Sequence, residues 1–148
     1  MNVSQKCQYA LRAIFELAKR KGHGPITAAE IANSQAIPRG FLEVILVELK
    51  KAGFINSRRG MRGGYQLAVL PGALTVGAII SSVDGPVAPI KCVADTNATD
   101  CPLYGTCAFL PLWERVKGAV TEIYDSTTFQ DLLDHETTGR GRHIGLNI

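Results

Sequence analysis

Two stretches in the first fifty residues carry apolar positions that recur with the period of a helix. Between residues 4 and 21, the spacing i, i+3, i+4, i+7 is met by Leu11, Ile14, Phe15 and Ala18. The stretch from Pro38 repeats this spacing at Leu42, Ile45, Leu46 and Leu49. Gly53 follows two lysines, and glycine accepts the left-handed conformation that ends many helices. Both stretches therefore predict amphipathic helices.

A short helix is predicted between these two, at about residues 28–34. Thr27 and Glu30 have the spacing of a capping box, in which each side chain accepts a hydrogen bond from the other residue's backbone amide. Residues 35–37 then make a tight turn into Pro38, which fits the first turn of a helix because its missing N–H costs nothing there. Two helices joined by so short a turn predict a helix-turn-helix.

Two runs compatible with strands follow, at residues 54–57 and 65–69, and they enclose a tip rich in glycine and arginine. The tip contains Arg58, Arg59 and Arg62. Arginine supplies the charge that attracts phosphate or a narrow minor groove, and glycine lets a backbone approach closely. Helix and hairpin together predict a winged helix-turn-helix that reads DNA; the alternative is a surface hairpin with solvated arginines.

The second half of the chain predicts helices around a long loop. A break at residues 71–72 precedes a helix predicted at about residues 76–83. Residues 86–106 show little periodicity, which is unusual inside a compact domain unless the loop has a function. A long helix is predicted from near Pro111, and a short helix begins at Thr128.

The long helix carries a wide apolar stripe. Spacings of four and three connect Leu112, Val116, Ala119 and Ile123, with Trp113, Val120 and Tyr124 beside them. Because a small domain cannot cover so much apolar face, we predict that the helix pairs with its copy in a homodimer. The alternative is that it packs back on its own domain.

Charge divides the chain into two unlike halves. Residues 1–70 hold 11 basic and 4 acidic side chains, a net charge of +7, whereas residues 71–148 hold 5 and 9, a net charge of −4. A basic front half suits a nucleic-acid-binding module. The 148 residues suffice for one domain or one domain with an appendage. Neither a membrane span nor a secretory leader is recognised, so we expect a cytoplasmic protein.

Three of the four cysteines lie in the long loop. Eight residues separate Cys92 from Cys101, and five separate Cys101 from Cys107, while Cys7 stands alone in the first helix. In a cytosolic chain, three thiols on one loop indicate ligands or redox groups rather than structural disulfides. Thiolates select iron–sulfur clusters or zinc, so the spacing leaves three alternatives open: a cluster, a metal-free thiol switch, and zinc.

The chain resembles the dimeric winged-helix iron–sulfur regulators of the IscR and NsrR type over about residues 3–134. The matching motifs are Tyr9-Ala-Leu-Arg-Ala, Leu42-Glu-Val-Ile-Leu, Lys50-Lys-Ala-Gly, Ser57-Arg-Arg-Gly, Gly63-Gly-Tyr-Gln-Leu, Asp84-Gly-Pro and the loop cysteines followed by Trp113. The combination is specific, although each motif alone is weak.

This resemblance implies a homodimeric transcription regulator, most simply a repressor, that binds double-stranded operator DNA. It also implies an iron–sulfur cluster on Cys92, Cys101 and Cys107, with [2Fe–2S] favoured and [4Fe–4S] the other choice. Glu43 matches a glutamate involved in base selection, and Arg58 and Arg59 match the wing. The full set of predicted DNA-binding residues is Arg39, Gly40, Glu43, Arg58, Arg59, Arg62, Gly63 and Tyr65.

Two departures from the family pattern concern the cluster. The first cysteine interval is three residues longer than in IscR and NsrR, and the positions of the family's fourth ligand hold Leu110 and Gln8. Cys7 lies beside the second of these positions, and a thiolate is a good iron ligand. The alternative is that Cys7 is a small buried residue of the first helix. Asp95 and Asp100 on the loop are further candidates.

The sequence therefore predicts a mainly α fold with a small β-hairpin. We expect a winged helix-turn-helix region at residues 1–72, a linking helix and cysteine loop at 73–109, a dimerisation helix and short helix at 110–135, and a flexible tail at 136–148. An enzyme is disfavoured because no catalytic triad, phosphate loop or carboxylate pair has a recognisable spacing. A metal-free, thiol-based redox regulator is the alternative function.

Overall fold

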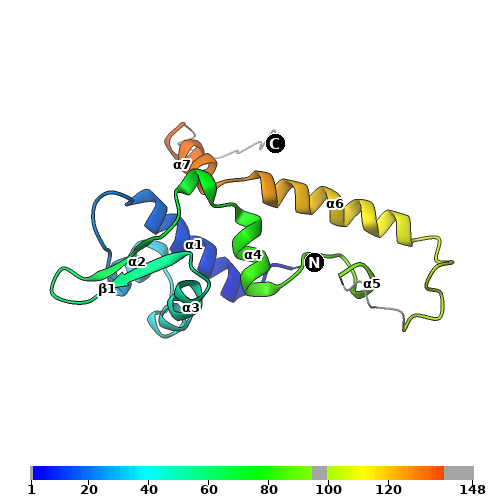
Figure 1. Ribbon diagram of the computed structural model, residues 1–148, viewed down its shortest axis with the longest axis horizontal. Coiled ribbons are helices and arrows are strands. Elements are labelled where there is room, and N and C mark those ends of the chain that lie inside the picture. The colour runs from blue at the N-terminus through cyan, green and yellow to red at the C-terminus, as the bar shows by residue number, and fades with distance from the viewer. Residues whose placement is uncertain (1, 95–99, 139–148) are drawn as a thin grey trace.

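In the computed structural model, residues 2–94 and 100–138 are described (Figure 1). The helices and strands in chain order are α1 (Gln5–Lys19), α2 (Ala28–Gln35), α3 (Arg39–Lys51), β1 (Ile55–Arg58), β2 (Gly64–Leu67), the 3-10 helix η1 (Pro71–Ala73), α4 (Val76–Asp84), α5 (Lys91–Ala94), α6 (Leu110–Ser126) and α7 (Phe129–Thr138). The predicted fold class is confirmed: mainly helical, with one two-stranded hairpin.

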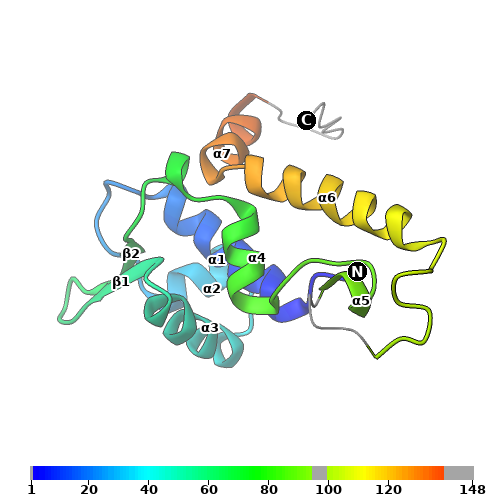
Figure 2. The same ribbon diagram turned by 45° about the vertical axis from the view of Figure 1, so that its right-hand side comes forward.

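The helix α1 is the centre of the fold. It contacts α2, α3, α4, α7 and β2, and its apolar face lies in a single core. The largest fully buried side chains of that core include Ile14, Leu17, Ile31, Leu42, Leu46, Leu49, Ile55, Ile79 and Phe129. Phe129 comes from α7, so the chain returns to the winged domain after α6 (Figure 2).

Helix boundaries follow the predicted caps closely. Ser4 accepts a hydrogen bond from the Cys7 amide at the start of α1, and Thr27 and Glu30 form both bonds of the capping box. Ala36 takes a left-handed conformation, φ 51°, in the turn between α2 and α3. Pro38 is the residue before the first turn of α3, and Gly53 has φ 85° just after its end.

The hairpin is shifted slightly from its predicted position. The antiparallel strands β1 and β2 pair Ile55 with Leu67 and Arg58 with Gly64, so Arg58 and Gly64 belong to strands and not to the tip. An isolated bridge joins Ile26 to Tyr65, which ties the hairpin to the segment before α2. This attachment fixes where the wing leaves the domain.

Two elements differ from the sequence predictions in the second half. The loop expected to be irregular contains the one-turn helix α5, and Cys92 lies in it. The helix α7 ends at Thr138, so His135 and residues 136–138 are helical, not the start of a tail. Lys19 of α1 pairs with Glu136 at 3.0 Å, which helps to hold this last turn against α1. The remainder of the predicted tail, residues 139–148, lies outside the described residues.

The helix α6 runs along the outside of the domain (Figures 1 and 2). It contacts α4 and α5, but in the described part of the chain none of its residues is buried. Leu112 is 47% exposed and Ile123 is 44% exposed. Packing on its own domain thus leaves the apolar stripe largely uncovered. Among the helices of residues 2–94 and 100–138, none is long and apolar enough to span a membrane.

Candidate nucleic-acid interface and cysteine loop

The predicted DNA-reading side chains of α3 lie on its exposed face. Leu42, Ile45, Leu46 and Leu49 are buried against the core, whereas Arg39, Gly40 and Glu43 are exposed. The Arg39 guanidinium lies 3.4 Å from the Glu43 carboxylate, one turn further along the helix. This exposed pair is weakly held, so each charge remains available to a ligand.

A buried polar network positions the turn before α3, and the sequence analysis missed it. Glu16 of α1 is only 4% exposed, and its carboxylate accepts hydrogen bonds from Arg20 Nε and Gln35 Nε2, both at 2.9 Å. Gln35 is the last residue of α2, so this contact ties α1 to the turn that aims α3. A glutamate on the apolar side of the first helix was the available signal, but its partner lies 19 positions away.

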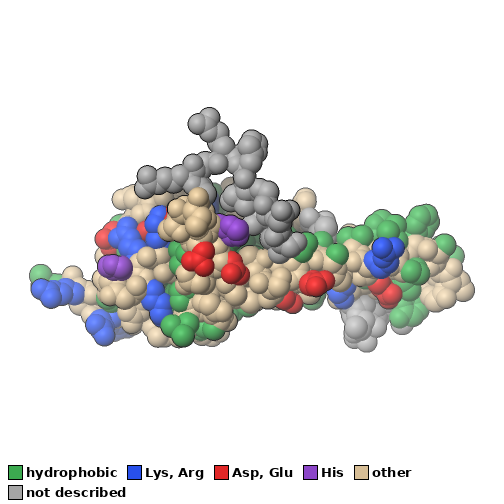
Figure 3. All heavy atoms as spheres, turned by 90° about the horizontal axis from the view of Figure 1, so that it is seen from above, with side chains coloured by type: hydrophobic (Ala, Val, Ile, Leu, Met, Phe, Trp, Pro, Cys, Tyr) green, Lys and Arg blue, Asp and Glu red, His purple; other side chains and the backbone are tan. Residues whose placement is uncertain are grey.

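The wing presents its arginines to solvent. Arg58, Arg59 and Arg62 are all exposed, and basic side chains gather at this end of the molecule (Figure 3). A Cβ added to Gly63 would lie 2.2 Å from the carbonyl oxygen of Arg58, so the tip closes only with glycine there. Lys50 Nζ donates to Ser57 Oγ at 2.6 Å and links α3 to β1. Recognition helix and wing are therefore one connected surface.

Tyr65 holds the wing rather than extending from its tip. Its amide donates to the carbonyl oxygen of Ile26 at 2.7 Å, and its carbonyl accepts from the Ile26 amide at 2.9 Å. The ring is half-buried against the core. Tyr65 and Gly63, which are among the predicted DNA-binding residues, thus also have structural roles. Tyr65 pairs the wing with Ile26, and Gly63 allows the tip of the wing to close.

The three loop cysteines occupy different surroundings. Cys92 is half-buried in α5, Cys101 is exposed, and Cys107 is half-buried three residues before α6. All four cysteines are free thiols. Within residues 2–94 and 100–138, no three cysteine, histidine or acidic side chains are grouped closely enough to hold a metal ion. Asp100 is exposed, and Asp95 lies outside the described residues.

A groove joins Cys92 to the helix α6. It has a volume of about 680 Å³, and its lining includes Cys92, Tyr104, Glu114, Lys117 and Glu122. Lys117 Nζ donates to the carbonyl oxygen of Val93 at 2.6 Å, which fixes α5 to the middle of α6. The Lys117 side chain therefore connects α5, which carries Cys92, to α6.

Cys7 fits the buried alternative. Its side chain is 0% exposed in α1, next to Asp84 at the end of α4. Burial, together with the negative charge of Asp84, raises the pKa of the Cys7 thiol to about 12. A thiol that resists ionisation and is closed to solvent is a poor iron ligand. We therefore leave Cys7 out of the ligand set proposed below.

The raised pKa of Cys7 predicts a pH-dependent stability. Below pH 9.0 the thiol is neutral in the folded and unfolded states; between pH 9.0 and about 12 only the unfolded state loses the proton. The free energy of unfolding should therefore fall as the pH rises through this window, by up to about 1.4 kcal/mol per pH unit. Denaturant titrations from pH 8 to 11 should show a shallower fall for Cys7→Ala. Equal slopes for the two proteins contradict the assignment.

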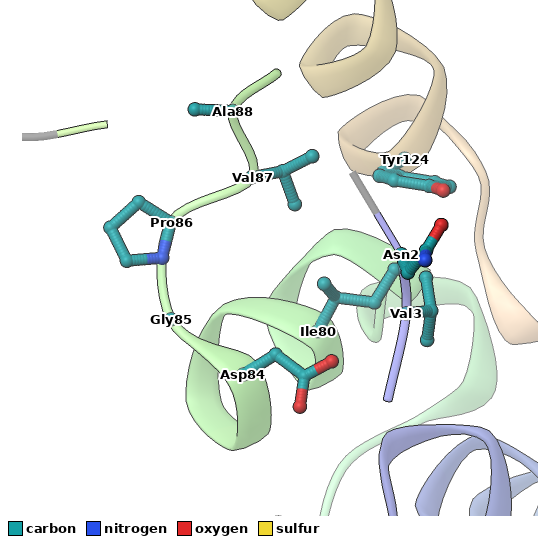
Figure 4. A pocket seen from close by; sticks show the side chains of 9 residues that line it. All are labelled: Asn2, Val3, Ile80, Asp84, Gly85, Pro86, Val87, Ala88 and Tyr124. Carbon is teal, nitrogen blue, oxygen red and sulfur yellow. The ribbon is translucent and has the colours of Figure 1, made fainter. Parts of the chain in front are cut away.

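Asp84 also anchors the start of the chain. Its carboxylate accepts hydrogen bonds from the Ser4 amide, at 2.8 Å, and from the Ser4 hydroxyl. Figure 4 shows Asp84 beside a pocket of about 260 Å³ that Val3 and Tyr124 also line. Val3 precedes α1, and Tyr124 comes from α6. The pocket therefore lies between the start of α1, the segment that follows α4 and the predicted dimerisation helix.

An apolar hollow lies next to the exposed stripe of α6. It has a volume of about 350 Å³, and it lies between α1, α4, α6 and α7. Its lining includes Leu11, Phe15, Ile123 and Leu132. At the other end of α6, the rings of Phe109 and Trp113 stack with centroids 6.5 Å apart. Of the predicted interface residues, Leu112 and Ile123 are exposed, and Trp113, Val116, Val120 and Tyr124 are half-buried.

A family model described as "Iron-dependent Transcriptional regulator", Rrf2, matches residues 3–135. The chain belongs to the Rrf2 family. It is accordingly a DNA-binding transcriptional regulator with a winged helix-turn-helix, and not an enzyme. The resemblance to IscR inferred from the motifs is thereby confirmed.

Three Rrf2 relatives show how far the likeness extends. The regulator CymR of Bacillus subtilis is 36% identical over 135 residues, 91% of either chain, and its solved structure superimposes with a TM-score of 0.76 over 91% of this chain and 98% of that one. T. potens IscR gives a TM-score of 0.76 at 31% identity, covering 97% and 93%. The oxidized form of Staphylococcus aureus CymR gives 0.69 at 32% identity, covering 89% and 95%.

Proposed function

We propose that this Rrf2 protein is a homodimeric repressor whose affinity for its operator is set by an iron–sulfur cluster on Cys92, Cys101 and Cys107. The observation that carries the proposal is the place of the cysteine loop in the chain. It joins the winged domain to α6, and Lys117 links α5 directly to that helix. A change in the loop therefore acts on the element that we expect to connect the two subunits.

The operator is read by α3 and the wing. We assign base contacts to Glu43, whose carboxylate accepts hydrogen bonds and so suits the N4 amino group of cytosine in the major groove. Arg39 and the wing arginines Arg58, Arg59 and Arg62 contact phosphates or the minor groove. Gly40 and Gly63 let the backbone approach closely. We expect the protein to be cytoplasmic, because it must have access to its operator DNA.

The wing arginines predict strongly salt-dependent binding. Each phosphate contact should contribute about 0.9 to the slope of log affinity against log salt. Arg59→Ala should lower that slope by about one contact, whereas Glu43→Ala should keep the slope and relax the base preference, at about 1 to 3 kcal/mol per base contact. Fluorescence anisotropy at several salt concentrations measures both. Binding that ignores salt, or that survives removal of all three wing arginines, is incompatible with this surface.

Dimerisation would cover the apolar stripe of α6. Ile123 of the stripe also lines the apolar hollow, and the rest of the described chain buries none of the residues of α6. A second copy of the same helix offers the same stripe, and an interface of two identical patches closes on itself. Two copies of α3 could then reach two half-sites of one operator.

The donors of the loop suit an iron–sulfur cluster in chemistry. Cysteine thiolates are the usual ligands of such clusters, most often four of them, and Cys107 lies three residues before α6. In the described residues the thiols are not grouped, so cluster binding would have to bring them together. The cluster would supply sensitivity to oxidants or nitric oxide, or to iron–sulfur supply. A [2Fe–2S] cluster is favoured, with [4Fe–4S] as the other form.

A metal-free thiol switch is the second candidate, and one observation favours it. The loop cysteines are free thiols and Cys101 is exposed, and a thiol that senses oxidants must be accessible to solvent. The CymR relative from Staphylococcus aureus has been solved in an oxidized form. Purification without oxygen separates the candidates: a cluster gives a coloured protein with iron and acid-labile sulfide, whereas a thiol switch gives a colourless protein.

A further inference from the structure

The outermost ridge of α3 is apolar. Residues opposite the buried face of a helix are found by advancing about 100° per residue. On α3 this ridge consists of Gly40, Val44 and Val47, at i, i+4 and i+7, and Lys51 follows at i+11. Val44 is 57% exposed and Val47 is 51% exposed, so neither contributes much to the core.

Charged and aromatic side chains surround the ridge. Arg39 lies at its start and Lys51 at its end, while Glu43 borders one side. Phe41 borders the other side, where its ring lies 6.3 Å from that of Tyr9. Two branched apolar side chains at the centre of a basic surface cannot contact phosphate favourably. Apolar groups on a ligand would be favourable partners for Val44 and Val47.

Gly40 adds an independent indication of close approach. Its φ angle is an ordinary helical one, and a Cβ built there meets no atom of the described residues within 4 Å. The fold would accept alanine at this position, and alanine favours a helix more than glycine does. Glycine at the first turn of the ridge leaves the backbone open to close approach from outside the chain.

We propose that the ridge formed by Gly40, Val44 and Val47 reads the C5-methyl groups of thymine in the major groove, with Val44 as the residue that determines specificity. This rests on the proposed function, in which α3 enters the groove. Thymine is the base that presents an apolar group there. Valine has no donor or acceptor, so it cannot read the polar edges of the other bases. The half-site would thus combine thymine with the cytosine that Glu43 selects.

The test removes single methyl groups from the DNA. The wild-type protein first selects tight duplexes from a random library, and each thymine of the best one is then replaced by uracil. Uracil pairs with adenine through the same hydrogen bonds and lacks only the methyl. Burial of one methyl is worth about 0.8 kcal/mol, so we expect the Kd to rise about four-fold for each contacted thymine. Thymines outside the contact serve as internal controls.

Val44→Ala should lose this discrimination, binding the thymine and uracil duplexes equally. Leu70→Ala is the matched control, because Leu70 is an exposed apolar residue, 65% exposed, in the turn after β2. It should keep the four-fold difference. The inference is wrong if no selected thymine responds to uracil, or if the response is the same with Val44→Ala. If the protein selects no duplex at all, the proposed operator binding is wrong as well. Selection of a duplex without any response to uracil rejects only the thymine recognition.

Discussion

Val116→Glu should convert the protein to monomers and weaken operator binding by about 10² to 10⁴-fold. Val116 lies in the half-buried part of the α6 stripe, where the proposed interface would enclose it. A carboxylate there would be buried without a partner in both copies, at a cost of several kcal/mol. Losing the second half-site then removes the gain in affinity that linked binding provides. Analytical ultracentrifugation and operator titration measure the two effects.

The control for this substitution is Leu70→Glu. It places the same charge on an exposed apolar position outside α6, and it should leave both the molecular mass and the affinity unchanged. Because Val116 is not part of the core cluster, the monomer should keep its circular dichroism spectrum. A wild-type protein that sediments as a monomer at micromolar concentration is incompatible with the proposed dimer.

Cys92→Ser, Cys101→Ser and Cys107→Ser should each abolish the colour of protein purified without oxygen and produce one common DNA-binding phenotype. Each substitution removes a thiolate ligand of the cluster. Without the cluster, no ligand bonds hold the loop in one arrangement. The change in operator affinity should be about 5- to 150-fold, the range of a coupling of 1 to 3 kcal/mol. Iron, sulfide and absorbance measurements, followed by titration of one operator at fixed salt, measure it.

Cys7→Ala is the matched control for the loop cysteines. Its thiol is buried among core residues of α1, so the variant should keep its colour and its regulated binding, and lose only some stability. Loss of colour in this variant would restore Cys7 as a ligand. If cluster-bound and cluster-free proteins bind the same operator equally, the loop is not a sensor.

Local signals explain why much of the fold was predictable from the sequence. The capping box of Thr27 and Glu30 and the stop at Gly53 act within one turn of the backbone, and both occur as expected. The wing was recognised because its glycines and arginines are adjacent in sequence. Its strands were misplaced by about one residue, since their register depends on pairing with Ile26 as well as with each other.

Long-range contacts explain what the sequence analysis missed. The short helix α5 is held by Lys117, which is 24 positions away, and no local pattern announces it. The helix α7 continues to Thr138, and Glu136 in its last turns pairs with Lys19, 117 positions earlier. At the candidate interface, the role of Glu16 depends on Gln35 from another helix. Such partners become visible only when the chain is folded.

The helix α6 can be treated as a rigid arm that rotates about its C-terminal end. Phe129 of α7, buried three residues after α6 ends, gives the pivot, and the first turn of α6 begins three residues after Cys107. Seventeen residues at about 1.5 Å each make an arm of about 25 Å. A displacement of about 3 Å at the cysteine end is then a rotation of about 7° about the pivot. A partner helix packed along the shaft would be turned with it, so a small chemical change at a thiol would reach the other subunit as a change of angle rather than of distance.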